Sequence, residues 1–119
     1  MNIAYSKILV ILLIFIGEAV SIYAEMVGAR NNDIAPQSFL SIFLKVFLII
    51  TVAGGFLVAG YMLGFKAFKN IWIVSVASIT SILIIEPILA WVFFKQVPTI
   101  GALSGFILGG VGLFLSIFF

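Results

Sequence analysis

Three ionisable side chains lie deep inside otherwise apolar runs of this sequence. Glu18 stands in the stretch LLIFIGEAVSIYAEM of residues 12–26, Lys45 follows SIFL, and Glu86 follows SILII. A charge at the centre of a bilayer costs about 2.5–3.5 kcal/mol on insertion scales, so such residues usually face a bundle interior or a wet cavity. A carboxylate there must be protonated or meet a cation, and both states are useful for exchanging a proton against a substrate. We therefore predict that Glu18 binds protons or cations.

Further polar side chains share the depth or the helical face of these residues. Each of the three lies roughly 10–15 Å from a span end on the same side of the membrane, which predicts similar depths. On the first span Glu25 projects within about 20° of Glu18. The structural alternative is that Lys45 pairs with a glutamate or extends its ammonium to the interface. The candidate substrate- and proton-binding residues are Glu18, Ser21, Lys45, Ser75, Ser78 and Glu86, with Tyr23 as a further lining donor.

The inventory of side chains excludes several kinds of chemistry. The 119 residues include no cysteine and no histidine, so disulfides, the usual zinc sites and nucleophile–histidine catalysis are excluded. We expect no metal and no cofactor. The net charge of +2 is spread over the chain and forms no patch for nucleic acid. Two carboxylates could do acid–base work, but no nucleophile stands in a recognisable setting, so an enzyme is not predicted.

These side chains require membrane-spanning helices to position them. The chain is 65% hydrophobic and 8% charged, with a mean hydropathy of +1.41, far outside the soluble range. The first span is too long, and SIYAEM too poor a cleavage site, for a signal peptide. The segment GARNNDIAPQS is the main predicted loop. Because a crossing helix needs about 20 apolar residues, we predict one all-α integral membrane domain, a bundle of four transmembrane helices at residues 7–28, 38–65, 71–94 and 99–119.

The basic residues specify the orientation of these spans only weakly. Lys7, Lys66 and Lys69 lie on one side, and Arg30 and Lys95 lie on the other, with Lys45 near that second side. The positive-inside rule therefore favours neither side, and insertion in both orientations is a hypothesis. We expect a multi-pass protein of a prokaryotic-type plasma membrane.

Small residues recur at helix-packing spacing on two of the spans. Gly60 and Gly64 form a G-x-x-x-G pair, and glycines repeat at every fourth position on the last span. Tolerance of glycine in membrane helices is the alternative. Pro87 removes one backbone hydrogen bond directly after Glu86 and is a candidate hinge. The predicted dimer or helix-packing residues are Gly60, Gly64, Gly101, Gly105, Gly109 and Gly112.

The C-terminal third resembles a known family of transporters. The segment AWVFFKQVPTIGALSGFILGGVGLF of residues 90–114 resembles the end of helix three and most of helix four of the small multidrug resistance transporters. The stretch EPILAW of residues 86–91 is similar to the E-P motif of EamA-type repeats in the wider drug/metabolite transporter superfamily. The resemblance implies a four-helix subunit acting as an antiparallel homodimer. By that resemblance Glu18 is the helix-one carboxylate that binds protons or cationic substrate, and residues 105–112 are the dimer contact. Ser78 stands where the family has a tryptophan.

The functional prediction is secondary active transport of small organic molecules, coupled to protons through Glu18, with alternating access around a midplane site. The alternative is a non-transporting or half-size membrane subunit that works only with a partner chain, which includes flipping of lipid-linked substrates. The expected partners are the substrate, protons, the lipid bilayer and either a second copy or a similar chain.

Overall fold

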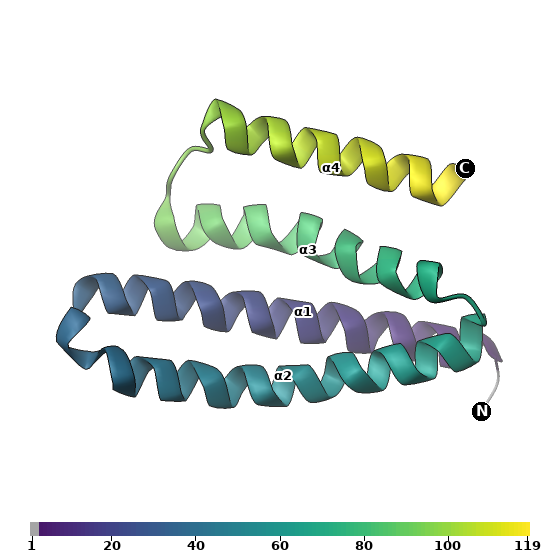
Figure 1. Cartoon of the computed structure of the whole chain (residues 1–119), viewed down its shortest axis with the longest axis horizontal. Helices are drawn as coiled ribbons and strands as arrows, with labels where there is room; N and C mark the ends of the chain where they lie inside the picture. The colour runs from purple at the N-terminus through teal and green to yellow at the C-terminus, as the bar shows by residue number, and fades with distance from the viewer. Residues whose placement is uncertain (1–2) are drawn as a thin grey trace.

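The computed structural model describes residues 3–119, and within that range the chain forms four α-helices and one 3-10 turn (Figure 1). All four helices are long and apolar enough to cross a membrane. The predicted all-α architecture with four candidate spans is therefore confirmed. The elements are α1 (Ile3–Ile34), η1 (Pro36–Ser38), α2 (Phe39–Phe68), α3 (Ile71–Phe94) and α4 (Ile100–Phe118).

The first helix extends beyond the span predicted from the sequence. Most of the polar segment predicted as a loop belongs to α1, which ends only at Ile34. Pro36 disfavours helical dihedrals in the residue before it, and Ala35 accordingly has φ −133° and ψ 71°. The connection to α2 is therefore a short turn.

Local capping explains where the other helices begin and end. Lys69 and Lys95 directly follow the last residues of α2 and α3, and both adopt the left-handed conformation that commonly closes a helix. The side chain of Asn70 accepts a hydrogen bond of 2.9 Å from the Trp72 N–H at the start of α3. Thr99 caps α4 in the same manner. Such caps satisfy backbone donors that the first helical turn leaves free.

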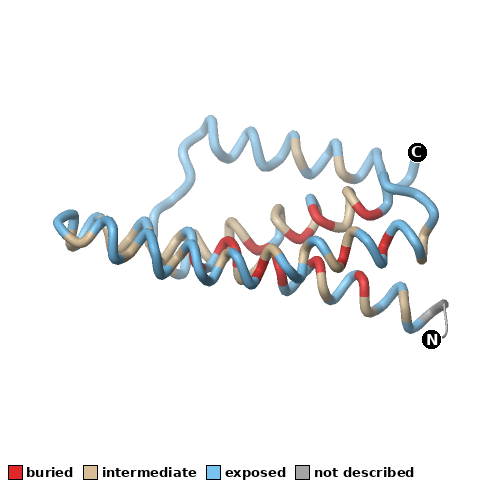
Figure 2. Tube along the Cα trace, turned by 60° about the horizontal axis from the view of Figure 1, so that its bottom comes forward, coloured by how far each residue is buried: buried red, intermediate tan, exposed pale blue. Residues whose placement is uncertain are grey.

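The helices are arranged as a hairpin with two further layers. Helices α1 and α2 lie antiparallel, α3 packs mainly on α1, and α4 lies outside α3 (Figure 1). Among the described residues, α4 contacts no helix except α3. The buried positions gather accordingly in α1, α2 and α3 (Figure 2), and within residues 100–118 no side chain is buried.

The core is small and depends on close approach of the hairpin helices. Val10, Ile14 and Val74 form its fully buried centre. A Cβ added at Gly60 would lie 2.7 Å from Ile14 Cγ1, and one added at Gly64 would lie 2.9 Å from Val74 Cγ2 and 3.0 Å from Val10 Cγ1. Glycine at these two positions therefore lets α2 approach α1 and α3 more closely than any larger residue would.

The hairpin is longer than the rest of the bundle. Helices α1 and α2 have 32 and 30 residues, whereas α3 and α4 have 24 and 19. At 1.5 Å per residue these counts give about 48, 45, 36 and 29 Å. The α1–α2 turn consequently extends past the end of α3 (Figure 1). This extension, residues 28–46, is called the overhang below.

Candidate functional site

Among the described residues, a single side-chain hydrogen bond joins α1 to α3. The Ser78 hydroxyl donates to Glu18 Oε1 at 2.6 Å, within the range for a hydroxyl donating to a carboxylate. Ser78 is only 7% exposed, and Glu18 is half-buried. We call this pair the Glu18–Ser78 site. It is the point at which the structure brings two of the sequence-predicted site residues into direct contact.

The helix faces that meet here explain why the pair forms. On α3 the buried residues Val74, Ser78, Ser81 and Ile85 follow the spacing of one helical face, which is turned toward the hairpin. Ser78 directs its hydroxyl across to α1, whereas the Ser81 hydroxyl donates to the Ala77 carbonyl of its own helix at 2.8 Å. Of these two buried serines, only Ser78 therefore donates a hydrogen bond to Glu18.

Small residues on α1 surround the glutamate. Ser21 and Ala24 are buried on the following turn. One position before Glu18, a Cβ added at Gly17 would lie 2.8 Å from the Leu57 side chain and 3.2 Å from the Ala53 carbonyl oxygen of α2. Glycine at this position allows α2 to come close beside the site. At this level of the bundle α1 therefore contacts α2 through Gly17 and α3 through the Glu18–Ser78 hydrogen bond.

Two more carboxylates lie nearer the α1–α2 turn than the Glu18–Ser78 site. Glu25 is seven residues beyond Glu18 on α1, and Glu86 is eight residues beyond Ser78 on α3, so neither lies at the depth of Glu18, the separation being roughly 10–12 Å along the helices. Glu25 is exposed on α1, and Glu86 is half-buried on α3. Ser75, the other α3 candidate, is half-buried as well. Within residues 3–119 no group of three acidic side chains is close enough together to hold a metal ion.

Lys45 does not join these carboxylates. The contact of Gly28 with Val46 and that of Gly17 with Leu57 fix how α2 lies along α1. Lys45 is therefore level with the end of the hairpin, about eleven residues or roughly 16 Å along α2 from the level of Glu18. The expectation of similar depth is wrong for Lys45, because it assumed a long loop between the first two helices. Its side chain is exposed.

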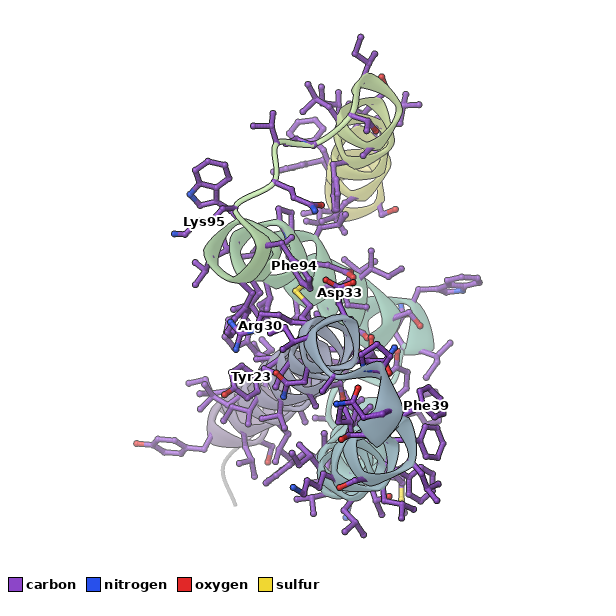
Figure 3. The ribbon with its side chains drawn as sticks, turned by 90° about the vertical axis from the view of Figure 1, so that its left-hand side faces the viewer. Tyr23, Arg30, Asp33, Phe39, Phe94 and Lys95 are labelled. Carbon is purple, nitrogen blue, oxygen red and sulfur yellow. The ribbon has the colours of Figure 1, made fainter. Side chains whose placement is uncertain are left out.

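Tyr23 also lies away from the site. Its ring packs edge-on against Phe93 with the centroids 5.5 Å apart, and the Arg30 guanidinium lies over the same Phe93 ring at 5.1 Å. Figure 3 shows Tyr23 and Arg30 on the same side of α1. This cluster fastens the end of α3 to α1.

The glycines predicted for packing divide into two groups. Gly60 and Gly64 lie in the tight contacts of the core described above. On α4, a Cβ added at Gly109 would lie 3.4 Å from the Leu83 side chain, an ordinary contact, whereas at Gly105 and Gly112 it would meet no described atom within 4 Å. At Gly101 it would meet only the Thr99 hydroxyl, at 4.0 Å. The glycine repeat of α4 therefore borders the α3 contact and is mostly open.

Sequence reasoning missed one polar residue of interest, Asn32. Its side-chain oxygen Oδ1 is buried and has no hydrogen-bond partner among the described residues. It follows Glu25 by seven positions, which places both on one face of α1. That spacing was available in the sequence, but the residue was assigned to a loop.

The fold and the site together define an all-helical chain with four candidate membrane spans and a carboxylate–serine pair between two of them. Comparison with protein-family models, with curated proteins and with solved structures finds no match.

Proposed function

We propose that this chain is a subunit of a secondary active transporter of small organic molecules and that Glu18 is its coupling group. The observation that carries the proposal is the hydrogen bond from Ser78 to a half-buried carboxylate far from either end of α1. An ionisable group at such depth is a functional feature in most membrane proteins. The resemblance of the C-terminal third to small multidrug resistance transporters adds support.

In the proposed cycle the Glu18 carboxylate is the shared binding point of protons and substrate. With neither bound, the carboxylate accepts the Ser78 hydrogen bond. A cationic group of the substrate, or a proton, then occupies the carboxylate, and each excludes the other. Glu86 and Glu25 add negative charge to the part of the bundle between Glu18 and the α1–α2 turn, which attracts cations more than anions. Pro87, inside α3, gives that helix a position with one backbone hydrogen bond fewer, at which it can bend.

The second candidate function is that of a membrane subunit that requires a partner chain. The observation that favours it is the position of α4, which touches only α3 within the described chain and presents open glycines. Such a surface suits another membrane helix, because small residues let helix backbones approach closely. A dimer, either of two copies or of this chain with a similar one, is compatible with both candidate functions.

Electrical recording from proteoliposomes tests the first proposal. Substrate-induced currents and changes in lumenal pH would be measured across a panel of cationic, zwitterionic and anionic small molecules, under an imposed proton gradient. Because exchange of one proton for one monovalent cation moves no net charge, the proton flux is the deciding signal, and we expect a flux with cations that Glu18→Gln abolishes. The matched control is Asp33→Asn, which neutralises an exposed carboxylate at the C-terminal end of α1 and should leave transport unchanged. A proton flux that persists in Glu18→Gln would refute the coupling role of Glu18. Absence of both current and substrate-driven proton flux with folded wild-type protein would favour the partner-dependent subunit.

A further inference from the structure

An open groove of about 290 Å³ lies between α1 and α2 in and beside the overhang, apart from the Glu18–Ser78 site. It lies between the end of α1 and the start of α2, next to their connecting turn. Its lining includes Glu25, Gly28 and Asn32 from α1, and Phe39, Phe43 and Val46 from α2.

The side chains of Glu25 and Asn32 bring hydrogen-bond acceptors to the groove, and the Asn32 amide nitrogen adds a donor. Glu25 contributes a carboxylate, and the Asn32 Oδ1 atom is shielded from solvent without a donor from the described residues. A buried acceptor that has lost its water needs a replacement donor, since leaving it unpaired is costly. The chemistry of the groove therefore calls for a ligand that carries N–H or O–H donors and a positive charge.

No basic residue lines the groove within the described chain. The one arginine of the sequence, Arg30, is engaged with the Phe93 ring and lies on the opposite side of α1 from Phe39 (Figure 3). The negative charge of Glu25 is therefore not neutralised by the groove itself. A cationic ligand complements it.

The apolar wall of the groove is aromatic. Phe39 and Phe43 are stacked, with ring centroids 6.0 Å apart and an interplanar angle of 22°. They are 58% and 51% exposed, respectively. Aromatic faces attract cations and accommodate hydrocarbon. The occupant should therefore combine a cationic group with an apolar portion.

The position of the groove along the membrane normal identifies the source of such a ligand. Lys7, Lys66 and Lys69 mark the headgroup layer at the far end of the hairpin, and about 20 residues of helix cross the hydrocarbon. Counted from Lys7, the opposite boundary falls near residue 27, between Glu25 and Asn32. The groove thus crosses the boundary at which lipid headgroups lie.

The geometry points to a binding site for an aminophospholipid with a primary ammonium headgroup, of the phosphatidylethanolamine type. The ammonium donates hydrogen bonds to Glu25 and Asn32, and the apolar part follows Phe39 and Phe43. A trimethylated choline headgroup carries the same charge but has no N–H, so it leaves the Asn32 oxygen unpaired. The site discriminates by hydrogen bonding as well as by charge.

Lipid retention by the full chain tests this assignment. The protein in detergent micelles is exposed to equimolar phosphatidylethanolamine, phosphatidylcholine and phosphatidylglycerol with identical acyl chains, and retained lipid is identified by native mass spectrometry. We expect the ethanolamine lipid to exceed the choline lipid by about tenfold, the ratio that one charge-assisted hydrogen bond supports. Retention of the mono- and dimethylated headgroups should be intermediate and fall with each added methyl group.

Variants localise the preference to the groove. Glu25→Gln and Asn32→Leu should each reduce the ethanolamine-to-choline ratio toward one, while Asp33→Asn, an exposed carboxylate on the same helix, should preserve it. Equal retention of the two lipids by the wild type, or a preference that survives both groove variants, overturns the proposal. Preferential retention of the glycerol lipid overturns it too. Binding of dodecylammonium without retention of the ethanolamine lipid would reassign the groove to soluble cations.

Discussion

Ser78 and Glu18 are 60 positions apart in the sequence, and the hydroxyl of the first donates a hydrogen bond of 2.6 Å to the carboxylate of the second. The bond ties α3 to α1 at the depth where proton and substrate are proposed to compete. A change in the protonation or the ligand occupancy of the Glu18 carboxylate therefore alters its hydrogen bond to α3. In this way the occupancy of one side chain can bias the position of a whole helix.

Removal of the Ser78 hydroxyl should weaken function at Glu18. Hydrogen bonds to charged groups are worth about 1.5–3 kcal/mol, so Ser78→Ala should change the half-saturating substrate concentration or the transport rate by roughly ten- to hundredfold. Ser78→Thr keeps the hydroxyl and should recover part of the activity. Proteoliposome uptake measured over a range of substrate concentrations and of pH checks this expectation.

Ser81→Ala is the matched control for that experiment. It removes another buried hydroxyl from the same face of α3, but one that donates to Ala77 of its own helix. Equal losses in Ser78→Ala and Ser81→Ala would mean that serine packing, and not the bond to Glu18, supports activity.

Lys45→Gln should leave the coupling of transport to protons intact. The contacts of Gly28 and Gly17 with α2 separate Lys45 from Glu18 along the bundle, so loss of its charge has little influence on the carboxylate. We expect proton-driven currents within about twofold of the wild type, since distant exposed charges are largely screened. A loss comparable to that of Glu18→Gln would contradict the separation of the two residues.

Gly60→Ala should destabilise the hairpin. The added methyl would stand 2.7 Å from Ile14 Cγ1 and 3.5 Å from the Ile14 nitrogen, and Ile14 is fully buried. Overpacking of this kind costs about 1–3 kcal/mol. Thermal unfolding in detergent, followed by helical circular dichroism, measures the loss.

Gly55 on the same helix provides the comparison. A Cβ there meets no described atom within 4 Å, so Gly55→Ala should unfold at or above the wild-type temperature, since alanine is the better helix former. Both variants gain the same intrinsic propensity, and the difference between them isolates the packing effect. If both variants melt together, the close approach of α1 and α2 at Gly60 is not limiting for stability.

Gly105→Leu should impair assembly without unfolding the subunit. A Cβ at this position meets no described atom within 4 Å, so a larger side chain fits the isolated chain but not a second helix packed against the glycine repeat. Cross-linking between copies through a single introduced cysteine on α4 should fall several-fold, as expected for about 1–3 kcal/mol of overpacking. Helical content should stay constant.

Gly110→Leu tests whether the effect belongs to one helix face. Gly110 is equally open but projects about 140° away from Gly105. It should leave cross-linking unchanged. A similar loss in both variants would argue for a general disturbance of α4 and against a specific interface.

Hydropathy predicted the elements of this fold well. The span predicted at residues 71–94 coincides with α3 (Ile71–Phe94), because Asn70 and Lys95 give clear boundaries. The first helix was predicted too short, because Asn31, Asn32 and Asp33 are weak helix formers that resemble a loop. A helix already formed can continue through such residues until Pro36 prevents it.

The site was less predictable, because it depends on how helices lie against one another. Helical phase grouped Glu25 with Glu18, since phase is a local property. The pairing of Ser78 with Glu18 depends on the register of α3 against α1, which packing around Val74 and Gly64 determines. The misplaced depth of Lys45 has the same origin, because a six-residue extension of α1 moves every residue of α2 relative to it.

The unequal helix lengths make the bundle responsive to bilayer thickness. At about 29 Å, α4 matches a hydrocarbon layer of about 30 Å while upright, whereas α1, at about 48 Å, must tilt or carry its ends into the headgroup layer. A thinner membrane increases the tilt required of the hairpin and imposes little on α4. Because α4 is joined to the described bundle only through α3, this hydrophobic mismatch acts on the angle between α3 and α4. Lipid composition can thereby change the position of α3 and, through the hydrogen bond from Ser78, the surroundings of the Glu18 carboxylate.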